Sequence, residues 1–466
     1  MNKETTIDCL IRTGHAMVKK NCTSPELLDA YYTWLLRFAY RNNIATIEVL
    51  PNNSRLHENI IFNKKSNDDR TLFIATELLK HGGHTPLLRH LVSAKSFSDS
   101  VVICRTADKD TGINHLILPH KSSYQRRAEV VTNSILEHRS VVILPHPDDY
   151  FLYILIARLP KVIRSKIVFI DHADHIISPF RELGLRRMLV RLPPGISFSD
   201  PVLPVDYLGI PIVPLNLKQE KGSNSKVGTK LIMTSGAPYK FAPRSGRNLV
   251  PDMITALLAK TKCLSAVAVG PRIQDTWWIK SRVLNLKRLK IVSKVGRKKY
   301  KTFLDKADVF LDSYPLTGGT AFTEALLSGK LVAGPKTALV GYGVADLLRV
   351  EIEDLQNYCS LLLKGDKIEK ENQERIRVLA AAIHEPAAVA ARLQSYIKSS
   401  GATVREELQS ELEYKKQEKY IVPSLTGIPK KDCLSIFPML WRALGSDYLR
   451  FALSVQMARR LAKFWR

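Results

Sequence analysis

Short apolar runs alternate with segments of helical periodicity in the first half of the chain. A short apolar run bounded by turn residues is typical of a buried strand, whereas apolar positions that recur every three or four residues indicate an amphipathic helix. Strands that alternate with helices predict a parallel sheet covered by helices. The predicted strands of this half are residues 46–50, 71–74, 101–104, 141–144 and 167–170.

A polar segment separates this half from a second half with the same rhythm. Residues 218–229 are rich in Gly and Ser and have no apolar periodicity, which is typical of a linker or a long surface loop. The alternation then restarts, and the chain therefore predicts two doubly wound α/β domains in tandem. The predicted strands of the second half are residues 231–234, 266–269, 290–292, 309–311 and 331–333.

The pattern divides the chain into four regions. We expect an N-terminal Rossmann-like domain over residues 1–217, a linker over 218–229, a second Rossmann-like domain over 230–400, and a basic helical extension over 401–466. In the extension, apolar residues recur at helical spacing while arginines fall on the other side, which predicts a basic amphipathic helix. Its apolar positions are Phe437, Leu440, Trp441, Leu444, Tyr448, Phe451 and Val455.

The composition is that of a globular protein with a large positive charge. The chain has 466 residues, of which 45% are hydrophobic and 24% charged, enough for two medium-sized cores. Its 70 Lys and Arg residues outnumber 44 Asp and Glu, and the formal net charge is +26. Such a charge favours phosphates, nucleic acid or an anionic membrane surface as partners.

The cysteines and the N-terminal residues bear on the compartment. The six cysteines are scattered without a Cys-x-x-Cys pair, so we expect neither a disulfide framework nor a zinc finger. The first residues are polar and lack the apolar run of a secretory signal, and no stretch reaches about 18 consecutive apolar residues. These features favour a reduced, cytoplasmic protein without a membrane span.

A strand, a glycine-rich turn and a helix follow one another between residues 309 and 334. Gly318 and Gly319 leave room for an anion beside the N-terminus of the helix that starts near Thr320, where backbone N–H groups favour a diphosphate. Glu324 lies one turn further on, where its carboxylate could accept hydrogen bonds from ribose hydroxyls. The alternative is a plain α/β turn that uses glycine for its geometry.

The segment over residues 307–334 resembles the donor-site motif of GT-B glycosyltransferases, especially bacterial relatives of protein O-linked N-acetylglucosamine transferase. The resemblance implies two Rossmann-like domains facing a cleft, with C-terminal helices. It also implies that Gly319 and Thr320 contact the donor diphosphate and that Glu324 binds ribose. The chain departs from the motif at Gly319, where the O-linked enzyme has His, and at Ala321, where it has Thr, so the identity of the donor does not carry over.

A second segment agrees with the first. Lys240 lies in a Gly/Pro loop after the strand over residues 231–234, where a lysine can neutralise charge that develops on a departing nucleoside diphosphate. The resemblance likewise implies that this lysine touches the donor phosphates, although surface lysines are more commonly only solvated. Gly270, at the end of the strand over residues 266–269, either borders the nucleotide through its backbone or is an ordinary turn residue.

In GT-B enzymes the acceptor and the general base come mainly from the N-terminal domain, so His and Asp residues after its strands are candidates. His84 belongs to a His-Gly-Gly-His segment, in which the resemblance implies that Gly83 borders the donor diphosphate. His172 and Asp174 belong to residues 171–175, which are similar to an Asn-His-Ala-Asp-His segment of the bacterial relatives. A neutral imidazole can take a proton from an acceptor hydroxyl, and a carboxylate can orient it.

Two alternatives stand beside this interpretation. A third cluster, from His146 to Asp149, is an equal candidate, and all three clusters could merely satisfy loop backbone groups. His172, Asp174 and His175 have spacing that could ligate a metal, but no further ligand cluster is obvious. GT-B enzymes as a class use helix dipoles and cations in place of a divalent ion. We therefore expect no metal and no cofactor other than the nucleotide sugar, which is a substrate.

Ten Lys or Arg residues and no acidic residue lie between Asp275 and Asp305. No helix-turn-helix, zinc finger or RNA-binding motif accompanies them, so a specific nucleic-acid partner is not expected. Together with the basic extension they favour an anionic membrane surface, although the terminal helix could instead pack on the N-terminal domain.

These features predict a cytoplasmic glycosyltransferase, peripheral at the inner face of the membrane. It would move a sugar from a nucleotide-diphosphate donor, expected to be a UDP-sugar, to a glycan or lipid-linked acceptor in bacterial polysaccharide or lipopolysaccharide synthesis. A nucleotide-sugar epimerase on the same scaffold, or a non-catalytic membrane or nucleic-acid adaptor, is the alternative.

Overall fold

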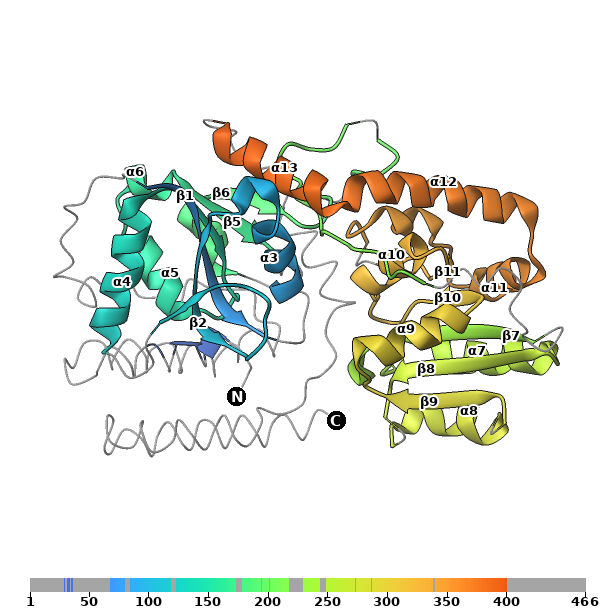
Figure 1. The fold of residues 1–466 in the computed structure, drawn as a ribbon. Coiled ribbons are helices and arrows are strands. Elements are labelled where there is room, and N and C mark those ends of the chain that lie inside the picture. The colour runs from blue at the N-terminus through green and yellow to red at the C-terminus, as the bar shows by residue number, and fades with distance from the viewer. Residues whose placement is uncertain are drawn as a thin grey trace, which may run out of the picture. The chain divides into compact units, whose positions relative to one another are not determined.

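A computed structural model of the chain contains two compact units, the first ending at Met188 and the second beginning at Leu189 (Figure 1). Each has its own sheet and its own apolar core. The residues described are Asp29, Tyr32, Thr33, Leu35 and Leu36, followed by residues 68–79, 84–118, 123–172, 178–193, 195–200, 202–217, 229–243, 249–272, 274–285, 287–337 and 340–399.

The first unit is built on a six-stranded sheet with the order β3-β2-β1-β4-β5-β6. Strand β1 pairs in parallel with both β2 and β4, and β4 pairs in parallel with β5. The chain winds outward from β1 in one direction and then returns beside β1 to wind in the other, as in doubly wound folds. The strands are β1 (Asp68–Leu78), β2 (Val101–Ala107), β3 (Leu116–Ile117), β4 (His138–Leu144), β5 (Ile167–Asp171) and β6 (Arg186–Leu189).

Helices connect these strands and bury their apolar sides. Helix α5 is almost entirely apolar, so it can lie in the core, and the side chain of Asp149 caps it by accepting the N–H of Leu152. Ser123 caps α4 in the same way through the N–H of Arg126. The helices are α3 (His84–Val92), α4 (Tyr124–Glu137), α5 (Tyr150–Ala157) and α6 (Lys161–Arg164), with short 3-10 turns at Lys95–Phe97 and Pro179–Leu183.

The second unit is built on a five-stranded sheet with the order β11-β10-β7-β8-β9. All four neighbouring pairs are parallel. Strand β7 is central, with β8 and β9 on one side and β10 and β11 on the other. The strands are β7 (Lys230–Ser235), β8 (Leu264–Gly270), β9 (Leu289–Ser293), β10 (Val309–Leu311) and β11 (Leu331–Ala333).

Seven helices accompany this sheet in the described part of the second unit. The longest, α12, starts at Asp366, whose side chain accepts the N–H of Glu369, and a left-handed Gly365 ends the preceding α11. Pro386 at the first position separates α13 from α12. The helices are α7 (Leu249–Lys260), α8 (Ile279–Leu284), α9 (Arg297–Lys306), α10 (Thr320–Leu327), α11 (Leu355–Lys364), α12 (Lys367–His384) and α13 (Pro386–Lys398).

Residues 189–217 pack with the second unit, although the sequence assigns them to the first. The fully buried Tyr207 belongs to the same apolar cluster as Met233 of β7. Arg392 of α13 donates to the carbonyl of Leu208, and Nδ1 of His384 lies 2.9 Å from the carbonyl oxygen of Ile210. The segment has no helix or strand of its own beyond the end of β6, so its apolar pattern could not show which core it joins.

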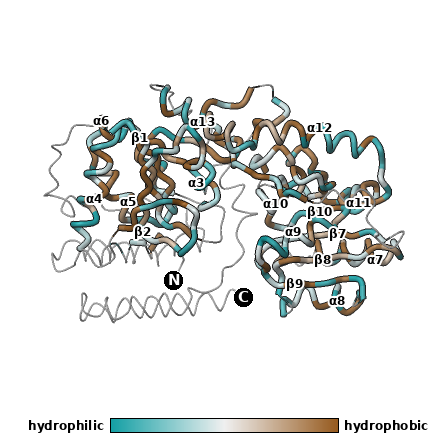
Figure 2. The backbone as a smooth tube through the Cα atoms, viewed as in Figure 1, coloured by the Kyte–Doolittle hydropathy of each residue, from teal (hydrophilic) through white to brown (hydrophobic). Residues whose placement is uncertain are grey.

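The predicted fold class is confirmed, because both units are parallel α/β sheets of the doubly wound type. Nine of the ten predicted strands lie within observed ones, and apolar residues run along both sheets (Figure 2). The tenth, residues 46–50, lies outside the described residues, as do residues 218–228 of the expected linker and the whole extension. Among the helices that the structure describes, none is long and apolar enough to span a bilayer.

Candidate functional site

The carboxyl edge of the second sheet has a switch point between β7 and β10. Strand order reverses there, because β8 lies on the other side of β7 from β10. In open α/β sheets this is where the loops after two strands diverge and leave a crevice for a ligand. The loop after β7 carries Lys240, and the loop after β10 carries Gly318 and Gly319. The structure thus brings together the two segments that the sequence marks as a donor site.

Lys240 joins these two loops. Its Nζ atom donates to the carbonyl oxygen of Thr317 at 2.9 Å, and its own carbonyl oxygen accepts the N–H of Leu316 at 3.3 Å. Burial lowers the pKa of the ammonium group; Asp312 opposes the shift and Arg349 adds to it. The lysine is therefore held beside the turn that precedes α10, in surroundings that make its positive charge costly unless an anion is near.

Asp312 organises the turn from inside the protein. Its Oδ1 atom accepts the N–H groups of Ser313 and Gly318, each at 2.8 Å, and its Oδ2 atom accepts Nη2 of Arg349 at 2.7 Å. A Cβ atom at Gly318 would lie 2.4 Å from that Oδ1 atom, so only glycine fits. Arg349 in turn binds Asp346 and lies over the ring of Phe322 at 4.3 Å. The sequence marked Gly318 as a candidate, but it gave no role to the Asp312 carboxylate that holds this glycine in place.

Helix α10 begins directly at this turn. Its N-cap is Gly319, with φ of 41° and without a side-chain cap hydrogen bond, and its first residue is Thr320. A positive φ at the N-cap explains the glycine there. The backbone N–H groups of the first turn and the helix dipole favour an anion at this end. Thr320 is exposed, so its hydroxyl lies at the surface beside the turn.

Glu324, the predicted ribose ligand, forms an ion pair in the structure. Its Oε1 atom accepts Nη2 of Arg297, the first residue of α9, at 2.7 Å. Burial raises the pKa of Glu324, and Arg297 acts in the opposite direction. The side chain of Glu324 is thus 15% exposed and that of Arg297 is 66% exposed. The sequence marked Arg297 as part of a basic run but not as a partner of Glu324. An ion pair with one partner so exposed contributes little to stability. Glu324 can therefore give up its contact with Arg297 at little cost when another hydrogen-bond donor approaches.

Gly270 ends β8 and lies against β7. Its φ is +108°, and a Cβ atom there would lie 2.0 Å from the carbonyl oxygen of Gly236. The glycine is therefore required by the close approach of two strand ends, as the turn interpretation expects. Its predicted contact with a nucleotide remains a prediction.

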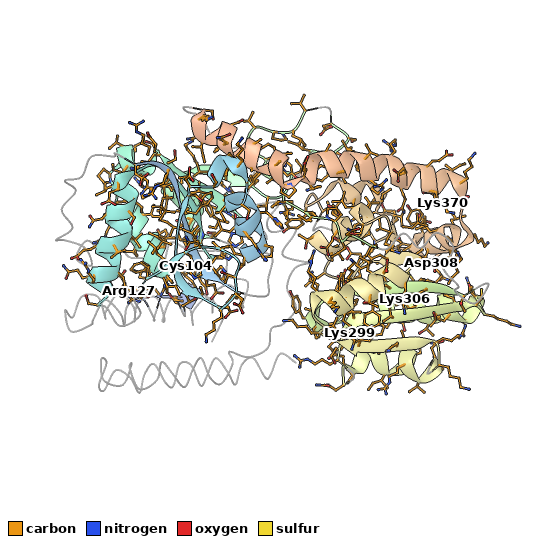
Figure 3. All side chains as sticks on the ribbon, in the orientation of Figure 1. Cys104, Arg127, Lys299, Lys306, Asp308 and Lys370 are labelled. Atoms are coloured by element: carbon orange, nitrogen blue, oxygen red, sulfur yellow. The ribbon has the colours of Figure 1, made fainter. Side chains whose placement is uncertain are left out.

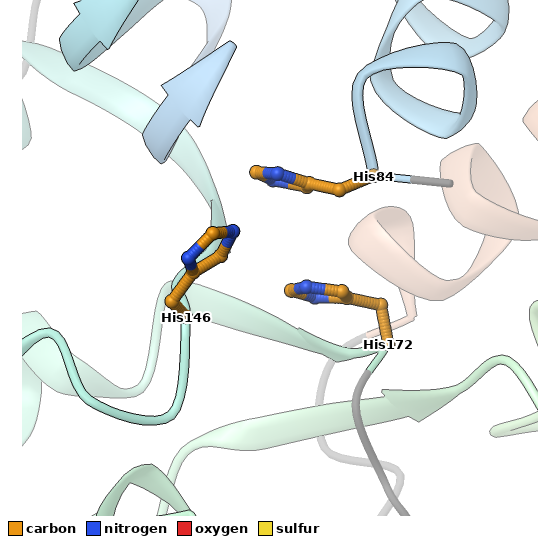
Figure 4. A group of neighbouring side chains, drawn as sticks. All are labelled: His84, His146 and His172. Atoms are coloured by element: carbon orange, nitrogen blue, oxygen red, sulfur yellow. The ribbon is translucent and has the colours of Figure 1, made fainter. Parts of the chain in front are cut away.

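The first unit places three histidines together at the carboxyl edge of its sheet (Figure 4). His84 is the first residue of α3, His146 follows β4, and His172 follows β5. The rings of His84 and His172 are stacked with centroids 4.7 Å apart, and that of His146 lies 5.2 Å from His84 and 6.2 Å from His172. Candidate residues from all three N-terminal clusters thus meet in space.

Each of two rings has a defined polar neighbour. Nδ1 of His146 lies 3.5 Å from Oε1 of Glu77, and the backbone N–H of His146 donates to Thr76. The ring of His84 hydrogen-bonds the backbone carbonyl of Leu144. Burial, followed by the neighbouring His172 and His146, lowers the pKa of His84 well below its ordinary value. His84 is therefore neutral at pH 7, the form that can accept a proton or ligate a metal.

Asp171, the residue before His172, forms ion pairs with two arginines. Asp171 is buried, and its Oδ2 atom lies 2.7 Å from Nε of Arg181 and 2.5 Å from Nη2 of Arg187. Burial alone would raise the pKa of Asp171, but the two arginines outweigh it and lower the pKa. Two further predicted residues, Asp174 and Gly83, lie outside the described residues.

Comparison with known proteins concerns the fold. The sequence matches no protein-family model and no curated protein. Among solved structures, an O-GlcNAc transferase mutant of Thermobaculum terrenum is 15% identical, with 79% of this chain and 77% of that chain covered and a TM-score of 0.49. WaaG, a glycosyltransferase involved in lipopolysaccharide biosynthesis, is 15% identical, with 71% of this chain and 100% of that chain covered and a TM-score of 0.46.

A third similar structure belongs to another kind of enzyme. A putative UDP-N-acetylglucosamine 2-epimerase from Listeria monocytogenes is 12% identical, with 71% of this chain and 96% of that chain covered and a TM-score of 0.46. At such identities a likeness concerns the fold alone, which serves many activities.

Proposed function

We propose that the protein is a glycosyltransferase that takes its sugar from a nucleotide-diphosphate donor, with a UDP-sugar as the expected donor. One observation carries the proposal: Lys240 is fixed to the carbonyl of Thr317 at the switch point, beside the N-terminus of α10. A cation and a helix N-terminus at one crevice suit a diphosphate.

The lysine has a role in the reaction as well as in binding. When the glycosidic bond to the donor breaks, negative charge grows on the departing diphosphate. An ammonium group already held in place stabilises that charge without reorganisation, so its effect is larger in the transition state than in the ground state. In this proposal Gly318, Gly319 and Thr320 contact the diphosphate, Gly270 borders the nucleotide, and Glu324 leaves Arg297 to accept hydrogen bonds from ribose hydroxyls.

The acceptor side belongs to the first unit in this proposal. His84, neutral at pH 7, and His172 beside it are the groups that can take a proton from an acceptor hydroxyl, with Asp174 and Gly83 as further predicted residues. The acceptor class is a glycan or a lipid-linked glycan.

The basic surface of helix α9 supports the proposal that the protein acts at an anionic membrane. Helix α9 exposes Arg297, Lys298, Lys299 and Lys306, of which Lys299 and Lys306 are labelled in Figure 3. Such a surface attracts anionic lipid headgroups and weakens with salt. We expect the protein to sediment with vesicles that contain anionic lipid at low ionic strength and to be released by salt. Reversing the charge of Lys298 and Lys299 with Glu should weaken this binding, and equal binding to neutral vesicles would contradict recognition of anionic lipid by this surface.

A ligand panel tests the central proposal. Thermal unfolding of the full chain should shift upward with one nucleoside diphosphate and with its sugar conjugates, because a ligand that binds only the folded state stabilises it. No shift with any of UDP, GDP, ADP, CDP and dTDP, or with their sugars, would contradict the proposal. Conversion of a nucleotide sugar to its epimer without an acceptor would show the alternative activity.

A further inference from the structure

We propose that His84, His146 and His172 form a binding site for a divalent transition metal, with zinc as the ion that suits the ligands best. The proposal does not depend on sugar transfer, and it gives His84 and His172 the role of metal ligands in place of that of a general base. Each ring offers a nitrogen, and the ligand atoms of the three all lie within 4.8 Å of one another. Three imidazoles are a known donor set for Zn²⁺, which then keeps an open position for water or another oxygen ligand.

The fold brings these ligands together from distant parts of the chain. Strands β1, β4 and β5 are neighbours in the sheet, so the segments that leave their carboxyl ends meet at one edge. His146 and His172 follow β4 and β5, and His84 opens the helix that follows β1. Figure 4 shows the three rings directed into a common space. All three ligands therefore lie on segments that leave neighbouring strands at the same edge of the sheet.

The ligand nitrogens of the three histidines need to move only slightly closer together to bind a metal ion. Zn–N bonds of about 2.1 Å in a tetrahedral site place ligand nitrogens roughly 3.4 Å apart. The present upper limit of 4.8 Å exceeds this by about 1.4 Å, a shift that rotation of the imidazoles about their side-chain bonds can supply. The stacked arrangement of His84 and His172, with ring planes 8° apart, is the part of the cluster that has to tilt.

Neighbouring groups orient the rings as they do in metal sites. Nδ1 of His146 faces the carboxylate of Glu77, which leaves Nε2 for a metal. The ring of His84 donates to the carbonyl of Leu144, and among the described residues its buried Nε2 atom has no hydrogen-bond partner. Metal-bound histidines characteristically give their second nitrogen to a carboxylate or a backbone carbonyl, and both kinds of partner are present here. A buried, unpartnered nitrogen is costly unless a ligand satisfies it.

A metal and a proton compete for the same nitrogens. An imidazole that ligates a metal has no lone pair left for a substrate proton, so the metal-bound cluster acts through its open coordination position. Binding should therefore weaken as the histidines are protonated at low pH.

Cobalt provides the test, because tetrahedral Co²⁺ absorbs visibly and zinc does not. The full chain is stripped with chelator and titrated with Co²⁺, with Cys263→Ser as the background because this exposed thiol could bind metal itself. We expect one equivalent to give the intense visible bands of a four-coordinate site, and one equivalent of Zn²⁺ to remove them. Zinc should also raise the thermal unfolding temperature.

Variants locate the signal. His146→Ala and His172→Ala should abolish the bands, and Glu77→Gln should weaken zinc binding about 10- to 100-fold, as loss of an orienting partner does. His115→Ala is the matched control, because His115 lies outside the cluster and its Nδ1 atom lies 2.6 Å from the carbonyl oxygen of Ile113. Absence of the bands in the parent protein, or bands that survive both histidine variants, would overturn the proposal. If a histidine variant does not fold, the parent titration and Glu77→Gln decide the matter.

Discussion

The guanidinium of Arg349 lies 2.7 Å from the carboxylate of Asp312, and both side chains are buried, 1% and 0% exposed. This pair anchors the turn before α10, because the other oxygen of Asp312 receives the N–H groups of Ser313 and Gly318. Removing Asp312 leaves the buried Arg349 with Asp346 as its remaining acidic partner, and it leaves the N–H groups of Ser313 and Gly318 without their acceptor. We expect Asp312→Ala to lower the free energy of unfolding by about 3 to 5 kcal/mol, measured by urea unfolding.

An exposed ion pair serves as the comparison for Asp312. Lys336 and Glu351 lie 2.8 Å apart with side chains 58% and 61% exposed. Glu351→Ala should change the stability by no more than about 1 kcal/mol. Equal effects of the two substitutions would contradict the anchoring role of Asp312.

Gly270→Ala should destabilise the second unit by introducing a Cβ atom 2.0 Å from the carbonyl oxygen of Gly236. Gly329→Ala is the control that separates the steric clash from backbone strain. Gly329 also has a positive φ, but a Cβ atom there would have no neighbour within 4 Å. The control should cost about 1 to 2 kcal/mol from strain alone, and Gly270→Ala clearly more. Thermal unfolding of both variants measures the difference.

Lys240→Ala should lower kcat of sugar transfer about 10²- to 10³-fold with the fold intact, because the leaving diphosphate loses its positioned cation. Lys330→Ala is a matched control: Lys330 also has its pKa lowered by burial and donates to a carbonyl, that of Asp305, at 2.6 Å. Steady-state kinetics with the donor identified by thermal shift give the comparison. Near-normal turnover in Lys240→Ala would break the proposed mechanism.

Glu324→Gln should weaken binding of the ribonucleoside diphosphate about tenfold, the worth of one charge-assisted hydrogen bond. The 2′-deoxy and 3′-deoxy forms of that nucleotide separate ribose contact from a structural effect. If Glu324 binds ribose, at least one deoxy form should bind parent and variant with similar affinity. A uniform loss for all three nucleotides, measured by calorimetry, would assign Glu324 to the structural pair with Arg297.

His384 makes the second unit sensitive to acid. The ring is fully buried; its Nε2 atom accepts the N–H of Val344 at 3.2 Å, which requires the neutral form. Burial lowers the pKa of His384 from 6.5 to about 4. Between pH 6.5 and about 4 the unfolded chain binds more protons at this histidine than the folded chain does. The contribution of His384 to the free energy of unfolding is therefore fully present above pH 6.5 and is lost as the pH falls to about 4.

The size of the acid effect follows from the same two pKa values. The contribution of His384 that is lost across this window is about 3 kcal/mol. Urea unfolding at a series of pH values should show this loss in the parent protein. His384→Gln keeps a donor and an acceptor but cannot titrate, and it should flatten that part of the profile; an unchanged profile would assign the acid sensitivity to other groups.

The sequence predicts the strands well where they are long and apolar and poorly where tertiary packing decides. Strand β3 has only two residues, both exposed, and β6 begins with Arg186 and Arg187. Neither was predicted, because β3 offers only two apolar residues and β6 starts with two arginines. Their pairing depends on neighbouring strands that already form a sheet.

The two segments that we propose to bind the donor were predictable because each is local: a strand and the turn that follows it lie within a few consecutive residues. The contacts that fix them are not local. Arg349 reaches Asp312 across 37 residues, and Lys240 reaches Thr317 across 77. The sequence marks the three histidines as separate candidates but does not show that they meet, since they come from three separate segments that only the strand order brings together.

The packing of residues 189–217 determines where the chain can be divided into two fragments that each keep their own apolar core. Phe198 and Tyr207 fill the interior of the second half, and α13 fastens this stretch through Arg392. A C-terminal fragment that starts at residue 230 would leave part of its own interior behind and expose the remainder to solvent. Fragments and chimaeras should therefore be divided after Leu189, the last residue of β6, so that the rest of this stretch stays with the half whose interior it fills.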